Sequence, residues 1–300
     1  MKIPANTLVH QGAMPIARHA VRTFCSTHRD CFSELIIHTD GSLTNEDRQD
    51  LSSMTQGMPF RFVEPWQRRQ MIDRICMNYP RTHAFLDGRG YRAKMEIPVV
   101  EQKPYFYFDS DVVWLQTCTN LLGDGNINLF STESWTWYPG IRKASVWAKS
   151  GTPRRVNSGF YFLKDPFPFD RMERLLSAGL YEPEAPWATD QEIMAFLYPG
   201  MRLYHPDDLM RSRRGILYDL VNLKAGSLHF PGRMWEHHLA LIATLHPTTL
   251  PRVLRITDPI PLLMTEIIRM KIILSTAQAN WSRGPVEIYR RIRARLKKNR

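Results

Sequence analysis

The chain has 300 residues, 43% of them apolar, which is enough to bury a substantial core in one large domain or two small ones. Its 23% charged and 11% aromatic residues exclude a collagen-like or disordered chain, and four cysteines are too few for a disulfide-dense scaffold. Lys and Arg number 40 against 29 Asp and Glu, so the net charge is +11. A surplus of this size favours an anionic partner, such as nucleic acid, anionic lipid or the phosphate of a small ligand.

The cysteines and the apolar stretches indicate the compartment. No two cysteines have the CxxC spacing of a zinc or redox site, so we expect reduced thiols in a reducing compartment. No stretch reaches the roughly 20 apolar residues of a membrane span, and no long apolar run of a secretory signal follows Met1. We therefore expect a cytoplasmic protein.

Short apolar runs alternate with helical patterns over the first 80 residues. Thr44 is followed three residues later by Asp47, a spacing close to that of a capping box, which predicts a helix start. Strands that alternate with helices in this way predict a parallel sheet covered on both faces, with ligands at the carboxyl ends of the strands. The expected strands are 7–9, 35–38 and 60–63, and the expected helices are 15–25, the segment that Thr44 opens, and 66–78.

Further along, the pattern predicts strands at 104–108, 112–114, 156–163 and 226–230, and a helix at 188–197. The first two of these strands flank Asp109-Ser110-Asp111. Residues two apart in an extended chain share a face, so both carboxylates can converge on one hard cation that also binds phosphates. A solvated turn is the alternative, but the apolar flanks bury both carboxylates, which then need a counter-charge.

Five ordered segments resemble a known family: YRAKMEIP, YFYFDSDVVW, VNSGFYFLK, ATDQEIMAFL and LHFPGRMW, spread over roughly residues 85–236. They are similar to the metal-dependent, nucleotide-sugar glycosyltransferases of the GT-A fold, particularly the retaining group of glycogenin and lipopolysaccharide galactosyltransferases. The resemblance implies a Rossmann-like α/β fold with a mixed, mainly parallel sheet flanked by helices. It also implies hexosyl transfer from a nucleotide-diphosphate sugar, by family default a UDP-sugar, to a glycan or glycolipid, with retention of configuration.

The resemblance implies a metal site and a phosphate site. Asp109, Asp111 and His229 match the family's ligands for Mn²⁺, although an oxygen-rich site with one imidazole also admits Mg²⁺. A lone histidine in an apolar strand is more often a core residue than a ligand, but Pro231-Gly232-Arg233 directly after it, a turn with a cation suited to a phosphate, favours the ligand. The residues that match the family's donor-phosphate site are Arg92, Lys94, Gly232 and Arg233. The sequence leaves open whether Arg92, Lys94 or both reach the donor, and a solvated basic loop is the alternative.

The sugar and nucleoside residues also follow from the resemblance. Asn157, Ser158, Ser110 and Asp190 match the sugar pocket, and Asp190 and Gln191 match the catalytic pair near the anomeric carbon. Asp190 in a helix-start position could instead act as a cap. We expect the nucleoside to bind at His10, Gln11, Gly12 and Asp40, because of the place of these residues in the fold. Because no carboxylate nucleophile stands out, we expect a same-face displacement without a covalent intermediate.

The charge is concentrated in the last 18 residues. Residues 283–300 carry eight basic residues and one acidic residue, a net +7 that leaves +4 for residues 1–282. Val286, Tyr289, Ile292 and Leu296 form an apolar stripe, as in a cationic helix that lies on an anionic membrane. We expect a transferase domain at 1–250 and a helical, basic amphipathic extension at 251–300, which could hold the protein at the inner face of the membrane. A solvated tail is the alternative.

Two rival functions remain at this point. A non-enzymatic polyanion binder would use the basic tail on nucleic acid, but it does not account for carboxylates and a histidine at strand ends, so we do not expect nucleic acid as a partner. A metal-dependent nucleotidyltransferase would also use paired aspartates. The first would be stabilised by nucleic acid, and the second would act on sugar phosphates and nucleoside triphosphates, whereas a glycosyltransferase would bind nucleoside diphosphates with Mn²⁺.

Overall fold

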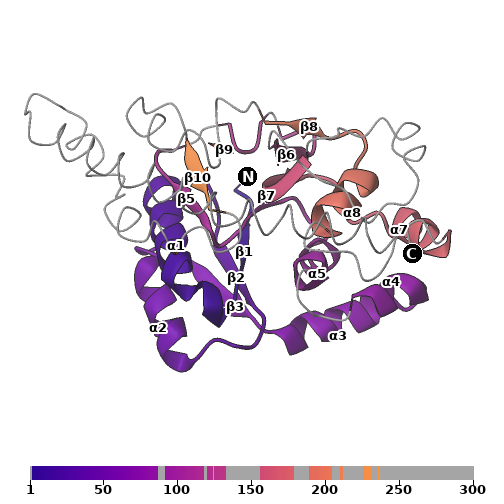
Figure 1. Ribbon diagram of the computed structural model, residues 1–300, viewed down its shortest axis with the longest axis horizontal. Coiled ribbons are helices and arrows are strands. Elements are labelled where there is room, and N and C mark those ends of the chain that lie inside the picture. Colours follow the sequence, from indigo (N-terminus) through magenta and orange to yellow (C-terminus); the bar gives the residue numbers. More distant parts are fainter. Residues whose placement is uncertain are drawn as a thin grey trace, which may run out of the picture. The chain divides into compact units, whose positions relative to one another are not determined.

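The computed structural model describes residues 2–86, 92–117, 120–123, 125–132, 156–178, 189–204, 210–211, 226–230 and 236, which lie in one compact unit, Met1–Pro247 (Figure 1). The strands are β1 Ala5–Val9, β2 Leu35–Thr39, β3 Phe60–Val63, β4 Tyr105–Phe108, β5 Val112–Trp114, β6 Leu129–Thr132, β7 Val156–Leu163, β8 Arg202–Leu203, β9 Met210–Arg211 and β10 Ser227–His229. The helices are α1 Met14–His28, α2 Asn45–Met54, α3 Pro65–Ile75, α4 Pro80–Phe85, α5 Arg92–Val100, α7 Phe169–Ser177 and α8 Thr189–Leu197, with a 3₁₀ helix η1 at Gln11–Ala13.

The main sheet has seven described strands in the order β3-β2-β1-β4-β7-β6-β8, and β5, β10 and β9 form a second sheet. Strands β3, β2, β1 and β4 are parallel, β7 is antiparallel to its neighbours β4 and β6, and β8 is parallel to β6. The carboxyl ends of the parallel strands therefore meet at one edge, and β7 begins there. This is the mixed, mainly parallel α/β sheet that the sequence predicts.

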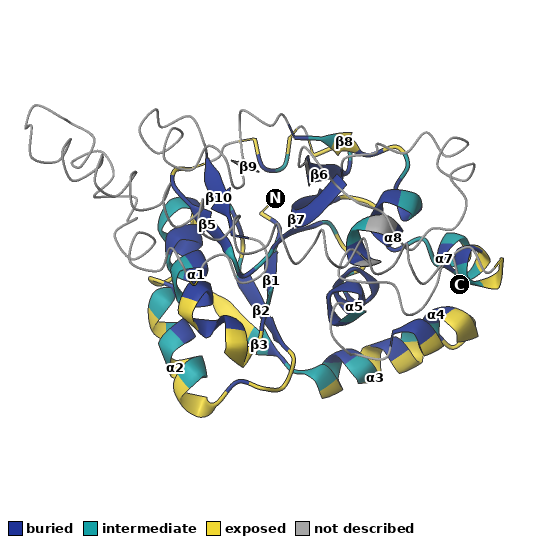
Figure 2. Ribbon diagram, in the orientation of Figure 1, coloured by how far each residue is buried: buried dark blue, intermediate teal, exposed yellow. Residues whose placement is uncertain are grey.

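Successive side chains of β4 point to opposite faces of the sheet, so its phenylalanines lie on one face and its tyrosines on the other. Phe106 and Phe108 pack in the cluster that includes Phe24 of α1, whereas Tyr105 and Tyr107 pack in the cluster formed with α5, α7 and α8. All four rings are buried, as Figure 2 shows for the strands of this region. A strand buried on both faces reads as a continuous apolar run, and here that run is YFYF.

A buried ion pair connects helices α3 and α5 to the carboxyl ends of the strands. Arg68 of α3 donates to Glu96 of α5 at 2.7 Å, and the two side chains are 1% and 3% exposed. The same guanidinium donates to the backbone carbonyls of Thr39 at 2.7 Å and Val63 at 3.2 Å, which are the last residues of β2 and β3. Because the charge is paired and hydrogen-bonded, it can be buried, and it fixes α5 against the strand ends.

The expected elements occur, and the structure adds others. The capping box at the start of α2 is confirmed, since the Thr44 amide donates to the Asp47 carboxylate at 3.0 Å and the Asp47 amide donates to the Thr44 hydroxyl at 3.1 Å. The alternative of a basic loop around Arg92 and Lys94 is wrong, because these residues begin α5. The structure also adds β6, β8 and β9, which the apolar pattern did not predict, as well as α4 and α7.

The expected extension at 251–300, with its basic helix at 283–300, lies outside the described residues. So does the domain boundary at 250. Within the part of the chain that the structure describes, no helix has the length and apolar character needed to cross a membrane.

Candidate active site

Asp109 and Asp111 lie in the tight connection between β4 and β5, at the carboxyl edge of the main sheet. The Val112 amide donates to the Asp109 carbonyl at 3.0 Å, and the Asp109 amide donates to the Gly159 carbonyl of β7 at 2.7 Å. The backbone of the connection is therefore held on both sides, which fixes where the two carboxylates project.

His229 reaches these carboxylates through strand pairing. β10 pairs antiparallel with β5, so that His229 lies opposite Val112, and the Phe230 amide donates to the Asp111 carbonyl at 3.0 Å. His229 Nε2 lies 3.3 Å from Asp111 Oδ1. One ligand atom from each of Asp109, Asp111 and His229 lies within 4.8 Å of the other two, a donor set of two oxygens and one nitrogen that fits a divalent ion. The structure thus brings together the three residues of the expected metal site.

Lys94 lies at the centre of the charged groups. Its ammonium is 2.7 Å from Asp109 Oδ1 and 3.0 Å from Asp190 Oδ2, and it donates to the Ser158 carbonyl at 2.8 Å. Asp190 lies in the first turn of α8, and its Oδ2 also accepts from the Ser158 hydroxyl at 2.6 Å. One cation from α5 therefore joins carboxylates from the end of β4 and the start of α8.

The electrostatics of this group reflect burial and pairing. Burial raises the pKa of Asp109 to about 6 against the attraction of Lys94, and the neighbouring Asp111 carboxylate adds to the rise. Burial by itself would lower the pKa of Lys94, but the carboxylates of Asp109 and Asp190 reverse this and raise it. Loss of the charged Lys94 side chain would therefore leave the buried Asp190 carboxylate and the partly buried Asp109 carboxylate without their common partner.

Two buried carboxylate oxygens at this edge accept no hydrogen bond from the described residues, Asp111 Oδ1 and Asp190 Oδ1. Asp109 differs, because Lys94 contacts both of its oxygens and the Tyr107 hydroxyl donates to Oδ1 at 2.8 Å. Buried acceptors without partners are costly, so they mark places where a ligand completes the site. A metal ion suits Asp111 beside His229, and a ligand hydroxyl suits Asp190.

The start of β7 shapes the floor of the site. Asn157 Oδ1 accepts from the Gly159 amide at 2.6 Å, so that the side-chain amide of Asn157 is partly engaged within the strand. A Cβ atom on Gly159 would lie 2.6 Å from that same oxygen and 3.1 Å from His229 Cε1. A larger residue at position 159 would therefore collide with the Asn157 oxygen and crowd the histidine ring. Ser110, between the two aspartates, is 9% exposed, and its role at the sugar stays a prediction.

The expected nucleoside residues lie at the ends of the neighbouring strands β1 and β2. The Gln11 amide donates to the Ser42 hydroxyl at 2.8 Å, and the Ser42 amide donates to Asp40 Oδ1 at 3.0 Å. His10, Gln11, Gly12 and Asp40 are all exposed. The two strand ends are therefore linked at an accessible edge, and nucleoside binding there stays a prediction.

The structure separates the two expected phosphate cations on α5. Residues two apart on a helix point to different sides, and Arg92 lies with its guanidinium carbon 5.1 Å from the centre of the Phe85 ring, while Lys94 contacts the aspartates. Gln191 follows Asp190 in α8 and is half-buried. Gly232 and Arg233 lie outside the described residues.

Sequence reasoning did not single out Tyr107 or the Arg68–Glu96 pair. The signal for Tyr107 was present, because residues two apart in a strand share a face and Tyr107 precedes Asp109 by two. For Arg68 and Glu96, 28 residues apart on different helices, no local pattern indicates that they pair.

Comparisons with known proteins extend to structures only, since no protein-family model and no curated protein matches the sequence. The chain is similar to the galactosyltransferase LgtC in complex with donor and acceptor sugar analogues, with 14% identity and a TM-score of 0.50 over 81% of this chain and 96% of LgtC. It is also similar to the bifunctional glycosyltransferase WbbM in its apo form, with 10% identity and a TM-score of 0.52 over 84% of this chain and 51% of WbbM. The chain therefore has the GT-A fold of nucleotide-sugar glycosyltransferases, as the resemblance in sequence implies.

Proposed function

We propose that the protein is a metal-dependent glycosyltransferase that moves a hexosyl group from a nucleotide-diphosphate sugar to a glycan or glycolipid acceptor. The observation that carries the proposal is the Asp109–Asp111–His229 cluster at the carboxyl edge of a GT-A sheet, in which the buried Asp111 Oδ1 accepts no hydrogen bond from the described residues. By family default the donor is a UDP-sugar. The fold supports the reaction class, and the cluster supports the metal.

The donor set favours Mn²⁺ and also admits Mg²⁺. Asp109, Asp111 and His229 would hold the ion, and Asp111 Oδ1 accepts no hydrogen bond from the described residues that the ion would have to displace. A divalent ion at this place would neutralise the charge that gathers on the leaving diphosphate.

The chain's own residues have separate tasks. Lys94 holds Asp109 and Asp190 at fixed positions, since its ammonium contacts both. Lys94 and Ser158 occupy Asp190 Oδ2, which leaves Asp190 Oδ1 to accept a hydroxyl of the donor sugar. Gln191, the next residue on α8, is then the side chain proposed to stabilise positive charge at the anomeric carbon. Asn157, Ser158 and Ser110 complete the sugar pocket in this proposal.

The stereochemical outcome is part of the proposal. We propose retention by same-face displacement, and the anomeric configuration of the first-formed product, followed by NMR, tests it. An inverted product would contradict retention while leaving glycosyl transfer intact.

The metal role is tested by Asp111→Asn. We expect Mn²⁺-dependent hydrolysis or transfer of the donor to fall about 100-fold or more, because the amide removes the anionic ligand. Asp30→Asn, at an aspartate whose side chain is 90% exposed beyond α1, is the matched control and should keep full activity. Circular dichroism should show both variants folded. Full turnover by Asp111→Asn, or turnover that does not depend on a divalent ion, would refute the metal role.

A further inference from the structure

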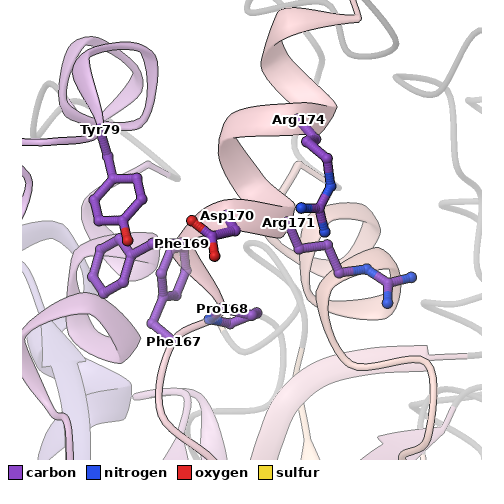
Figure 3. A pocket seen from close by; sticks show the side chains of 7 residues that line it. All are labelled: Tyr79, Phe167, Pro168, Phe169, Asp170, Arg171 and Arg174. Carbon is purple, nitrogen blue, oxygen red and sulfur yellow. The ribbon is translucent and has the colours of Figure 1, made fainter.

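A hollow lies at the opposite edge of the main sheet from the carboxylate cluster. β7 begins beside the cluster at Val156, runs for eight residues, roughly 25 Å of strand, and leads into the segment that lines this hollow. The volume of the hollow is about 340 Å³. Its lining comes from the residue directly before α4, from α7 and from the loop between β7 and α7, and consists of Tyr79, Phe167, Pro168, Phe169, Asp170, Arg171 and Arg174 (Figure 3).

Two arginines of the lining lack a counter-charge among the described residues. Arg171 and Arg174 are three residues apart on α7, hence neighbours on the helix surface, and neither forms an ion pair with a described carboxylate. Arg171 Nε is buried without a hydrogen-bond partner, and its guanidinium carbon lies 4.8 Å from the centre of the Phe196 ring. Burial, and then the charge of Arg174, lower the pKa of Arg171. Two adjacent cations, one of them partly desolvated, are the setting in which an anionic group is bound tightly.

The acidic residues of α7 are engaged elsewhere. Glu173 accepts from the backbone amides of Arg81 at 3.1 Å and Thr82 at 2.9 Å, at the start of α4. The negative charge of Asp170 raises the pKa of the Tyr79 hydroxyl, so this carboxylate lies near that ring. Figure 3 shows Asp170 on the Tyr79 side of the hollow and the arginines on the other side. Neither acid therefore neutralises the arginine pair.

The remaining wall is apolar and held by ring contacts. Tyr79 and Phe169 are stacked, with ring centres 4.8 Å apart, and Phe167 meets Phe169 edge-on at 4.9 Å. An apolar wall that faces a carboxylate and two guanidinium groups matches a sugar ring, which offers C–H groups on one side and hydroxyls at its rim. The volume lies at the lower end of the range for ligand pockets, which suits a single sugar residue.

We propose that this hollow binds a sugar residue that carries one anionic group, a phosphate or a carboxylate. Arg171 and Arg174 bind the anionic group, Asp170 accepts a hydrogen bond from a sugar hydroxyl, and the Phe167–Pro168–Phe169 wall packs on the ring. Such a residue comes either as a free sugar phosphate or sugar acid, or as an acidic unit within a glycan chain. The site stands apart from the carboxylate cluster and does not depend on the metal.

The test is a titration of the full chain with glucose 6-phosphate, glucuronate, glucose and inorganic phosphate, followed by calorimetry. We expect glucose 6-phosphate or glucuronate to bind and glucose to bind at least 10-fold more weakly. Arg174→Gln, at an exposed position where the fold should be kept, should weaken binding of the anionic sugar at least 10-fold. Arg29→Gln, an exposed arginine beyond the end of α1, is the matched control and should change nothing. Equal binding by Arg174→Gln and the unchanged chain, or equal binding of glucose and its phosphate, would overturn the proposal.

Asp170→Asn separates a sugar site from a simple anion site. Removal of the carboxylate should weaken the binding of glucose 6-phosphate several-fold, because the acceptor for a sugar hydroxyl is lost. Inorganic phosphate should bind as well as before or better. If Asp170→Asn strengthens the binding of both ligands alike, the hollow is an anion site only and the proposal fails. Binding of a tetrasaccharide with an internal glucuronate, compared with free glucuronate, then distinguishes a glycan chain from a free sugar acid. Mn²⁺ binding should be unaffected by Arg174→Gln, so failure here leaves the transferase proposal untouched.

Discussion

The two faces of the main sheet bury different kinds of side chain. On the face of α1, Phe24 stacks on Phe108 at 4.3 Å and meets Trp114 edge-on at 5.6 Å, in a cluster of aromatic and aliphatic residues. On the face of α3, α5 and α8, buried charges are interleaved with the apolar cluster, including the Arg68–Glu96 pair and Lys94 with its two aspartates. Apolar burial on the first face stabilises the fold, whereas the charges on the second face position the site.

The difference shows how one sheet serves both stability and chemistry. Apolar burial contributes roughly 25 cal/mol per Å² and needs no particular geometry. Buried charges contribute little net stability but are strongly destabilising when one partner is removed, so they hold defined positions. Substitutions on both faces should therefore lower the free energy of unfolding, but only those on the charged face should also change the properties of the site.

The largest effect is expected from Lys94→Met. Loss of the ammonium leaves the buried Asp190 carboxylate and the partly buried Asp109 carboxylate without their common partner, which should lower the free energy of unfolding by about 3–5 kcal/mol. Urea unfolding measures this, and calorimetry should show an altered Mn²⁺ affinity as well. Lys103→Met, at an exposed lysine, is the matched control. A loss below about 1 kcal/mol would mean that the buried charges are not coupled in this way.

Phe24→Ala should give a comparable loss of stability with no effect on the site. Phe24 is fully buried, so its truncation should cost about 3–5 kcal/mol through lost burial and the cavity left behind. Unlike Lys94→Met, it should leave the Mn²⁺ affinity of the folded protein unchanged. A changed affinity would show that the two faces are not independent.

The smallest expected effect is on the pH dependence of stability, through His28 on the α1 face of the sheet. Burial lowers the pKa of His28 from 6.5 to about 3. A depressed pKa in the folded state means that the unfolded chain takes up the proton first, so stability present above pH 6.5 is lost as the pH falls towards 3. The slope attributable to His28 is about 1.4 kcal/mol per pH unit in that window.

His28→Phe removes this titration while keeping a ring that can stack on Phe24, 5.1 Å away. Urea unfolding between pH 5.5 and 4.5 should then show a stability slope smaller by about 1.4 kcal/mol per pH unit. An unchanged slope would indicate that the His28 ring is already accessible to protons in the folded protein.

The sequence by itself determined the elements that local pattern encodes. The run YFYF predicts a strand buried on both faces, Thr44 and Asp47 predict a helix start, and the strand–helix alternation predicts a parallel sheet. The Asp109–Asp111 spacing indicated a ligand at the end of that sheet. The predictions of the strand, the helix start and the sheet succeed because each rests on neighbours within a few residues, where periodicity and capping act, whereas the ligand stays a prediction.

Only the tertiary structure decided which side chains meet. The register of β5 with β10 brings His229 to Asp111, the helical turn of α5 selects Lys94 over Arg92 as the partner of Asp109, and α8 places Asp190 on the same ammonium. The hollow beside Tyr79 depends likewise on α4 and α7, which are held together by Glu173. Contacts between residues far apart in the chain depend on strand register and helix packing, and no local pattern of residues records either.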